Sequence, residues 1–136
     1  MIYVASKSSY YDMWLVARST GLPINSTWID EAGEGQTIDK GILAERCLEE
    51  IRAASCMVLF IGNADVLRGA AIELGAALSH GKMVFVVGPK SALSRVFAEH
   101  YSIEYFQDII SALSAAKIFD DAAVAFGLVK PAGPAR

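Results

Sequence analysis

The sequence predicts an α/β fold with a parallel sheet, and two observations carry this prediction. Short runs of apolar, mostly β-branched residues alternate along the chain with longer segments of helical periodicity. These short runs are apolar on both faces, which is typical of a parallel sheet covered by helices on both sides. The composition agrees, because 54% of the residues are hydrophobic and 20% are charged.

Five segments have the pattern of strands. Each is a short apolar run bounded by Gly, Pro, Ser or charged residues. In chain order we expect them at Ile2–Ala5, Ile24–Ile29, Cys56–Ile61, Met83–Val87 and Ile103–Tyr105.

The segments between the strands are expected to be mainly helical. Gly21 and then Pro23 stop the first helix, and Asp39 or Thr37 caps the second. The acidic stretch Asp30–Asp39 contains two glycines and is expected to be a loop. The helices are Tyr10–Thr20, Lys40–Ala54, Ala70–His80, Asp108–Lys117 and Asp120–Phe126, with a short helix over Ser91–Glu99. One domain then spans residues 1–126, followed by a Gly/Pro tail over residues 127–136.

This alternation implies right-handed crossovers and a three-layer sandwich of the flavodoxin or Rossmann type. Five strands favour the order 2-1-3-4-5, in which ligands bind between the carboxyl ends of the first and third strands. The loops Ser6–Ser9 and Gly62–Gly69 are expected to flank this crevice. Trp28 and Asp30 are expected beside it, at the tip of the second strand.

Bulk properties exclude several kinds of partner. The net charge is −3 and no basic cluster occurs, so a nucleic-acid polymer is not an expected partner. No apolar run is long enough to span a membrane, and the N-terminus is polar by Ser6, too early for a signal peptide. Cys47 and Cys56 lack the spacing of a metal site. We therefore expect reduced cysteines in a cytoplasmic protein without a metal or cofactor.

Glu73 is the strongest candidate for chemistry. It is the single charge in the small, apolar segment GAAIELGAAL at residues 69–78, and burying an unpaired charge is costly. A position near a helix N-terminus favours the ionised carboxylate. An ionised carboxylate suits a nucleophile or a stabiliser of an oxocarbenium ion, not a general acid. The alternative is a glutamate placed only to complement the helix dipole.

Several other residues surround this candidate site. Tyr3 is placed to hydrogen-bond Glu73, although a strand tyrosine more often packs in the core. Trp28 stacks on a base if it is exposed and belongs to the core if it is buried. A loop with hydroxyls, an ammonium and free amides suits a phosphate, although serines there also serve as caps; it comprises Ser6, Lys7, Ser8 and Ser9.

Three segments carry a resemblance to a known family. IYVAS at residues 2–6, GAAIELGAAL at 69–78 and GKMVFVVG at 81–88 resemble the nucleoside 2-deoxyribosyltransferase-like superfamily. This group includes transferases that exchange bases on deoxyribose and hydrolases that cut the N-glycosidic bond of nucleoside 5′-monophosphates. The glutamate-bearing helix also occurs in cytokinin-activating phosphoribohydrolases and, more loosely, in Toll/interleukin receptor-type NAD hydrolases.

The resemblance implies roles for particular residues. Glu73 matches the nucleophile that attacks the anomeric carbon, and Tyr3 matches the tyrosine that orients it. The loop Ser6–Ser9 matches the segment that contacts the sugar and the 5′-phosphate. Ser91 is the nearest match to a serine that a neighbouring subunit supplies, so the resemblance implies a homodimer or higher homo-oligomer.

The chain departs from the family at two carboxylates. Cys47 stands where the second carboxylate is expected, flanked by Glu45, Glu49 and Glu50, and Leu67 replaces a further aspartate. Asp30 and Asp65 are the remaining candidates for protonating the leaving group. We expect an N-glycosidase for nucleosides or nucleotides. The alternatives are base exchange, a catalytically silent nucleotide-binding module and, ranked lower, cleavage of NAD.

Overall fold

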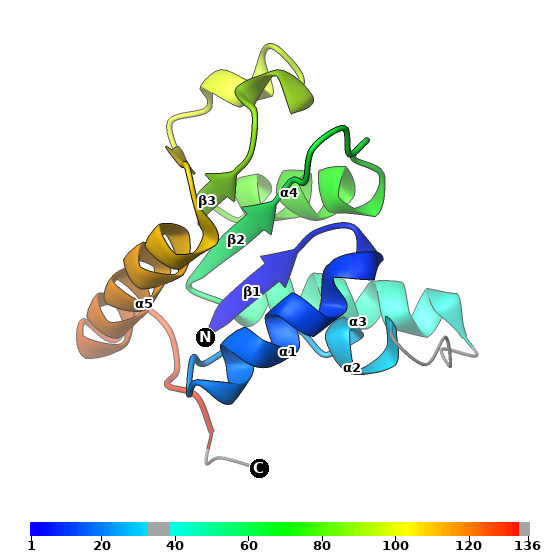
Figure 1. Ribbon diagram of the computed structural model, residues 1–136. Coiled ribbons are helices and arrows are strands. Elements are labelled where there is room, and N and C mark those ends of the chain that lie inside the picture. Colours follow the sequence, from blue (N-terminus) through cyan, green and yellow to red (C-terminus); the bar gives the residue numbers. More distant parts are fainter. Residues whose placement is uncertain (33–38, 134–136) are drawn as a thin grey trace.

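The centre of the molecule is a parallel sheet of four strands in the order β1-β2-β3-β4 (Figure 1). The computed structural model describes residues 1–32 and 39–133. The strands are β1 (Ile2–Ala5), β2 (Cys56–Phe60), β3 (Met83–Val87) and β4 (Ile103–Phe106). All of β1 is buried, as are β2 and β3 apart from Phe60 and Met83. The predicted α/β class with a parallel sheet is therefore confirmed.

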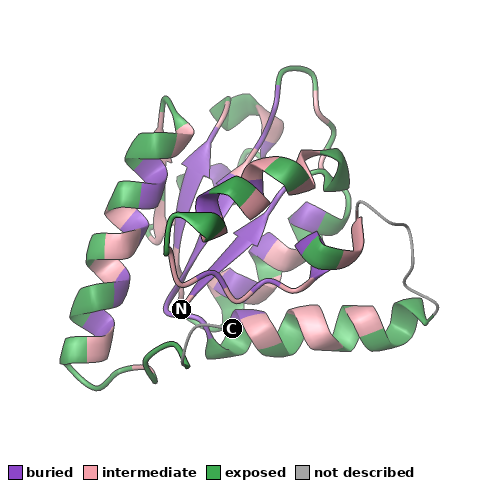
Figure 2. Cartoon of the chain, turned by 60° about the horizontal axis from the view of Figure 1, so that its bottom comes forward, coloured by how far each residue is buried: buried purple, intermediate pink, exposed green. Residues whose placement is uncertain are grey.

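Helices cover both faces of this sheet. Figure 1 shows α1 and α5 in front of the strands and α3 and α4 behind them, and Figure 2 shows that the buried residues of the helices lie on their inner sides. The helices are α1 (Tyr11–Ser19), α2 (Trp28–Ala32), α3 (Lys40–Ala53), α4 (Gly69–Ser79) and α5 (Ile109–Ala125). In the part of the chain that the structure describes, no helix is long and apolar enough to cross a membrane.

The expected strand over Ile24–Ile29 does not form, so the prediction of five strands in the order 2-1-3-4-5 is not met. Ile24 makes only an isolated parallel bridge with Ile2. The Ile2 N–H donates to the Pro23 carbonyl at 2.8 Å, and the Asn25 N–H donates to the Ile2 carbonyl at 3.1 Å. Backbone pairing beside β1 ends there.

Along the rest of the β1 edge, side chains make the hydrogen bonds that the backbone of a neighbouring strand would have made. Ser26 Oγ accepts the Val4 N–H at 2.7 Å, and Trp28 Nε1 donates to the Val4 carbonyl at 2.9 Å. Because buried backbone groups must be paired, these two bonds stabilise the β1 edge without a fifth strand. The chain then turns into α2 at Trp28, so residues 30–32 are helical and not part of a loop. Residues 33–38 of that expected loop, including Thr37, lie outside the described residues.

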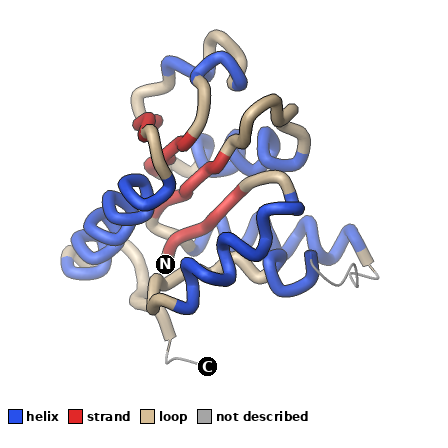
Figure 3. The backbone as a smooth tube through the Cα atoms, viewed as in Figure 1, coloured by secondary structure: helices blue, strands red, loops and turns tan. Residues whose placement is uncertain are grey.

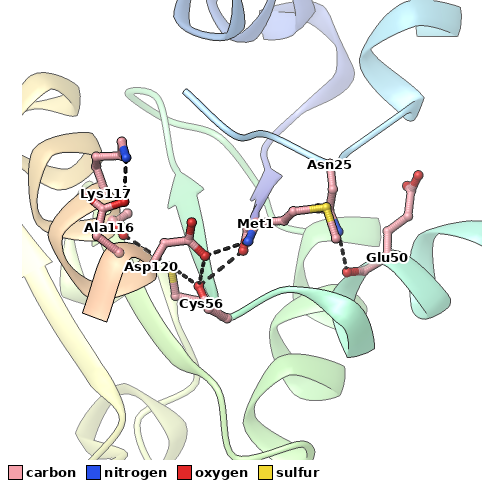
Figure 4. A network of polar contacts seen from close by, with 9 residues as sticks. Met1, Asn25, Glu50, Cys56, Ala116, Lys117 and Asp120 are labelled. Atoms are coloured by element: carbon pink, nitrogen blue, oxygen red, sulfur yellow. Dashed lines mark hydrogen bonds and ion pairs between the residues drawn. The ribbon is translucent and has the colours of Figure 1, made fainter. Parts of the chain in front are cut away.

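The two helices expected near the C-terminus form one helix, α5. No glycine or proline interrupts it between Lys117 and Asp120. Asp120 lies on its buried face, where the carboxylate accepts hydrogen bonds from Ser55 Oγ at 2.7 Å and from the Met1 ammonium at 2.5 Å (Figure 4). These partners offset the burial of a charge in mid-helix. Residues 127–133 contain no helix or strand.

Several local signals act as expected. Gly21, with φ of +98°, follows α1, and the Asp39 carboxylate caps α3 by accepting the Ile42 N–H at 3.0 Å. The connection from β3 to β4 differs, because the expected helix over Ser91–Glu99 forms only two 3₁₀ turns, η2 (Lys90–Ala92) and η3 (Phe97–Glu99). Figure 3 shows this connection as mostly loop.

Candidate active site

Glu73 and Tyr3 meet between the sheet and the helix behind it. Glu73 lies in the second turn of α4 and is half-buried, whereas Tyr3 on β1 is fully buried. The Tyr3 hydroxyl donates a hydrogen bond to Glu73 Oε2. The contact expected from the sequence is therefore present, and it restricts the orientation of the carboxylate.

The protonation of Glu73 differs from the expectation. Burial raises its pKa to about 7; the hydrogen bond from Tyr3 opposes this rise and the charge of Glu50 adds to it. The helix dipole contributes little in the second turn, because its effect is confined mainly to the first. The carboxyl group is thus partly protonated at neutral pH. The sequence analysis expected the helix start to favour the ionised form, and burial outweighs that effect.

Tyr3 remains a proton donor over the physiological range. Burial raises the pKa of its hydroxyl, and the charge of Glu73 raises it further. A neutral phenol in this place favours the ionised form of Glu73 by donating to it. The pair therefore consists of a fixed donor and a carboxylate that gains and loses a proton near neutrality.

Cys47 lies beside this pair, at the position that the resemblance assigns to a second carboxylate. Its half-buried thiol interacts with the Tyr3 hydroxyl. Burial raises the pKa of the thiol and the charges of Glu73 and Glu50 add to the rise, while Tyr3 and Arg46 oppose it. A neutral thiol consequently borders the carboxylate at the place where the resemblance implies a second acidic group.

Glu50 is a site residue that the sequence analysis treated only as a neighbour of Cys47. It follows Cys47 by three positions on α3, a spacing that puts both on one face of a helix. Its carboxylate is half-buried and accepts hydrogen bonds from the Thr27 N–H at 3.2 Å and the Thr27 hydroxyl at 2.8 Å. The i, i+3 spacing is the signal that identifies it.

The serine loop after β1 divides into a structural and an exposed part. Ser6 is buried, and its hydroxyl accepts from Trp14 Nε1 at 2.8 Å and donates to the Lys7 carbonyl at 2.9 Å. Lys7, Ser8 and Ser9 are exposed at the carboxyl end of β1, and no side chain caps the η1 turn (Ser8–Tyr10). Ser6 therefore holds the loop, and the next three residues remain available to a ligand.

Three other candidates lie apart from this arrangement. Trp28 is buried against β1, so its indole belongs to the core and is not exposed for stacking on a base. Asp30 is exposed, and Arg18 donates two hydrogen bonds to it at 3.0 and 2.5 Å. Ser91 is exposed in η2, after β3.

The two glycines of the second loop have different surroundings. A Cβ at Gly62 would lie 2.0 Å from the Tyr10 hydroxyl oxygen, so a larger residue there requires the Tyr10 side chain to move. Asp65 connects the loop after β2 to the segment after β1. Its carboxylate accepts hydrogen bonds from the Gly62 N–H at 2.8 Å and from the Tyr10 hydroxyl at 3.3 Å. A Cβ at Gly69 would lie 3.9 Å from Glu73 Oε1, the oxygen that Tyr3 does not bind.

Two cavities of about 500 Å³ lie elsewhere on the molecule. The first is mainly apolar and is lined by Ala71, Gly75 and Leu78 of α4, which are on the opposite side of that helix from Glu73. The second lies at the ends of β3 and β4 and is lined by Lys90 and Tyr105, among others. Neither cavity is lined by Glu73 or Tyr3.

Comparison with known proteins finds no significant match to this chain among family models, curated proteins or solved structures. Within residues 1–32 and 39–133, no group of three or more His, Cys, Asp or Glu side chains is arranged to hold a metal ion. The geometry around Glu73 is therefore the main basis for a functional proposal.

Proposed function

We propose that this protein is an N-glycosidase that cleaves the bond between base and sugar in a nucleoside or in a (deoxy)nucleoside 5′-monophosphate. The hydrogen bond from the buried Tyr3 hydroxyl to Glu73 carries this proposal. It binds one carboxylate oxygen and leaves the other, Oε1, beside Gly69. The resemblance of residues 2–6 and 69–88 to the nucleoside 2-deoxyribosyltransferase-like superfamily supports the same reaction class.

The chemistry follows from the environment of the carboxylate. Breaking an N-glycosidic bond develops positive charge on the sugar, which a carboxylate in a poorly solvated place stabilises strongly. In its ionised form, Glu73 Oε1 attacks C1′ while the bond from C1′ to the base breaks. The base leaves with the electron pair and takes up a proton from water. Water then hydrolyses the glycosyl ester and regenerates the carboxylate.

The substrate class is proposed from the exposed end of β1. Lys7, Ser8 and Ser9 offer an ammonium and two hydroxyls at the start of α1, groups that suit a 5′-phosphate. We further propose that the protein acts in the cytoplasm as a homodimer, to which Ser91 of each chain contributes at the neighbouring site. A monomer mass in light scattering argues against this last assignment.

The test is a nucleoside and monophosphate panel with identification of the products. The wild type is expected to release free base and sugar or sugar phosphate, and E73Q to release none. E49Q is the matched control, because Glu49 is exposed and paired with Arg52 on the outside of α3. Undiminished cleavage by E73Q contradicts the assignment of Glu73. A new nucleoside formed in the presence of a second free base identifies base exchange instead of hydrolysis.

A catalytically silent nucleotide-binding module is the second candidate. The observation that favours it is the neutral thiol of Cys47 beside Tyr3 and Glu73, where the related enzymes have an acidic group. Isothermal titration calorimetry distinguishes the two candidates. Tight binding of a monophosphate that is recovered intact favours binding alone, and loss of the ligand with appearance of free base favours the enzyme.

A further inference from the structure

We propose that the apolar cavity beside α4 is a second binding site, for a small organic anion with an apolar body, such as a medium-chain carboxylate. The cavity lies between α4, the loop after β2 and the connection from β3 to β4. Figure 1 shows both connections at the end of the molecule toward which the strand arrows point. The site is on the opposite side of α4 from Glu73, and the inference does not depend on the proposed function.

The cavity has the size and the lining of a ligand site. Its volume is about 500 Å³, within the range of about 300–1,000 Å³ that is typical of small-molecule sites. Leu74 and Leu93 in its lining are buried, whereas Val66 and Phe97, which also line it, are 78% and 56% exposed. Clustered apolar side chains in contact with water favour the binding of an apolar group. An alkyl or aryl group is therefore the part of the ligand that fits the cavity.

The face of α4 that borders the cavity leaves room for this group. Ala71 and Gly75 lie on that face about one turn apart, and neither has a side chain larger than a methyl group. A Cβ at Gly75 would meet no other atom within 4 Å. Glycine is less favourable than alanine inside a helix, and no close neighbour requires it here. Its effect at this position is to keep the cavity open.

Two arginines next to the lining residues indicate the charge of the ligand. Arg68 directly follows the lining residue Leu67. Arg95 directly follows the lining residue Ser94. Both arginines are exposed, and neither forms a salt bridge within residues 1–32 and 39–133. Guanidinium groups without a carboxylate partner favour an anionic head group, because they bind carboxylate and phosphate oxygens in pairs.

The neighbouring charges leave this preference in place. Among the described residues that line the cavity, Asp65 has the only carboxylate, and it already accepts two hydrogen bonds. Glu99 of the same connection is paired with Lys90 at 2.6 Å. A two-fold contact centred on this cavity would bring Arg68 and Arg95 of two copies together, and like charges disfavour it. A small anion therefore matches the cavity and its surroundings better than a second copy of the chain.

Calorimetric titration of the full chain with ligands that share one alkyl chain tests the inference. The ligands are octanoate, 1-octanol and octylammonium, whose head groups are negative, neutral and positive. Octanoate is expected to bind about tenfold more tightly than 1-octanol, and octylammonium most weakly. Acetate, which has the head group without the apolar body, is expected not to bind measurably. No binding of octanoate, or equal binding of octanoate and octylammonium, overturns the inference.

Two variants locate the bound anion. G75L places a side chain in the cavity and is expected to weaken octanoate binding by about tenfold or more. S79L is the matched control, because Ser79 is exposed on α4 and does not line the cavity. If G75L does not fold, as judged by thermal unfolding, A71L takes its place. Unchanged octanoate binding in the folded cavity variant overturns the inference.

The double variant R68Q/R95Q tests the charge separately from the cavity. It is expected to weaken octanoate binding about tenfold and to leave 1-octanol binding unchanged. R52Q is the control, because Arg52 is paired with Glu49 on α3, away from the cavity lining. Equal octanoate affinity of R68Q/R95Q and the wild type overturns the role of the two arginines.

Light scattering distinguishes a second copy of the chain as the occupant. A wild-type dimer that G75L converts to a monomer, without octanoate binding to the wild type, overturns the inference. Octanoate binding by a protein that cleaves no nucleoside or monophosphate contradicts the proposed function and leaves this site intact. Cleavage without octanoate binding has the opposite meaning.

Discussion

The hydroxyl of Tyr3 donates a hydrogen bond to the carboxylate of Glu73, a residue 70 positions later in the chain. The bond joins the edge strand β1 to the second turn of α4. Tyr3 cannot turn away because it is fully buried in the sheet. A fixed donor beside a half-buried carboxylate leads to four predictions.

Y3F is expected to raise the pKa of Glu73 above its value of about 7 in the wild type, because the lost hydrogen bond favours the ionised form. The pH at which cleavage reaches half its maximum should rise with it, by about one unit. Phenylalanine keeps the buried ring, so the packing of β1 is retained. Carboxyl titration and a pH–rate profile check this prediction. A midpoint that falls in Y3F contradicts the role of Tyr3 as donor.

Cleavage by the wild type is expected to rise with pH and level off above about 7, because the ionised form of Glu73 attacks the sugar. If Glu73 acted as a general acid, the pH–rate profile would have the opposite slope, with activity lost as the pH rises through the same value. The dependence of kcat/KM on pH distinguishes the two roles. A profile that falls through neutrality assigns Glu73 to proton donation.

The stability of the protein is expected to depend on the same group. Folding raises the pKa of Glu73 from its ordinary value of 4.5 to about 7, so the folded state holds the proton more tightly. The resulting stabilisation is full below the ordinary pKa and is lost as the pH rises through about 7, by at most about 1.4 kcal/mol per pH unit. Urea unfolding at several pH values measures it. E73Q is expected to lose this part of the pH dependence, and equal slopes in both proteins contradict the prediction.

Two glycines on α4 offer a matched steric test of the reacting oxygen. G69A places a methyl group 3.9 Å from Glu73 Oε1, whereas a methyl group at Gly75 meets nothing within 4 Å. Both changes leave the fold intact, so thermal unfolding should differ little between them. G69A is expected to reduce cleavage about tenfold or more by crowding the approach to Oε1, and G75A to leave it unchanged. Equal cleavage activities of G69A and G75A would show that the substrate does not approach Glu73 Oε1.

The side-chain hydrogen bonds that replace the expected fifth strand at the β1 edge can be tested by measuring stability alone. S26A leaves the buried Val4 N–H without its acceptor and is expected to cost about 1–3 kcal/mol of unfolding free energy. S19A is the control, because Ser19 is exposed and bonds only within its own helix. Its effect should remain within about 0.5 kcal/mol. Chemical denaturation measures both values, and a neutral S26A shows that water replaces the hydroxyl at the β1 edge.

Where local signals are strong, sequence and structure agree. The strands Ile2–Ala5 and Met83–Val87 have the predicted bounds, because each is a continuous apolar run with polar or glycine residues beside it. Asp39 caps α3 through a short-range bond that its own position makes available. The pairing of Tyr3 with Glu73 was also predictable, since the topology brings the first strand close to the helix after the strand Cys56–Phe60.

Where the structure differs from the sequence prediction, side-chain contacts between distant parts of the chain are the reason. Residues 24–29 have the composition of a strand, but Ser26 and Trp28 bind the β1 edge through their side chains. The alternation of apolar and polar residues that predicts a strand carries no information about such contacts. Likewise, two apparent helices join into α5 because Ser55 satisfies Asp120 in mid-helix from a distant part of the chain.

The sequence by itself determined the class of fold, the position of Glu73 and its tyrosine partner, because these depend on local apolar patterns and the order of elements. Only the tertiary structure decided the number of strands and the proton on Glu73. The physical reason is that burial and charge act through space. Sequence position alone indicated an ionised helix-start glutamate, whereas desolvation between β1, α3 and α4 raises its pKa to about 7.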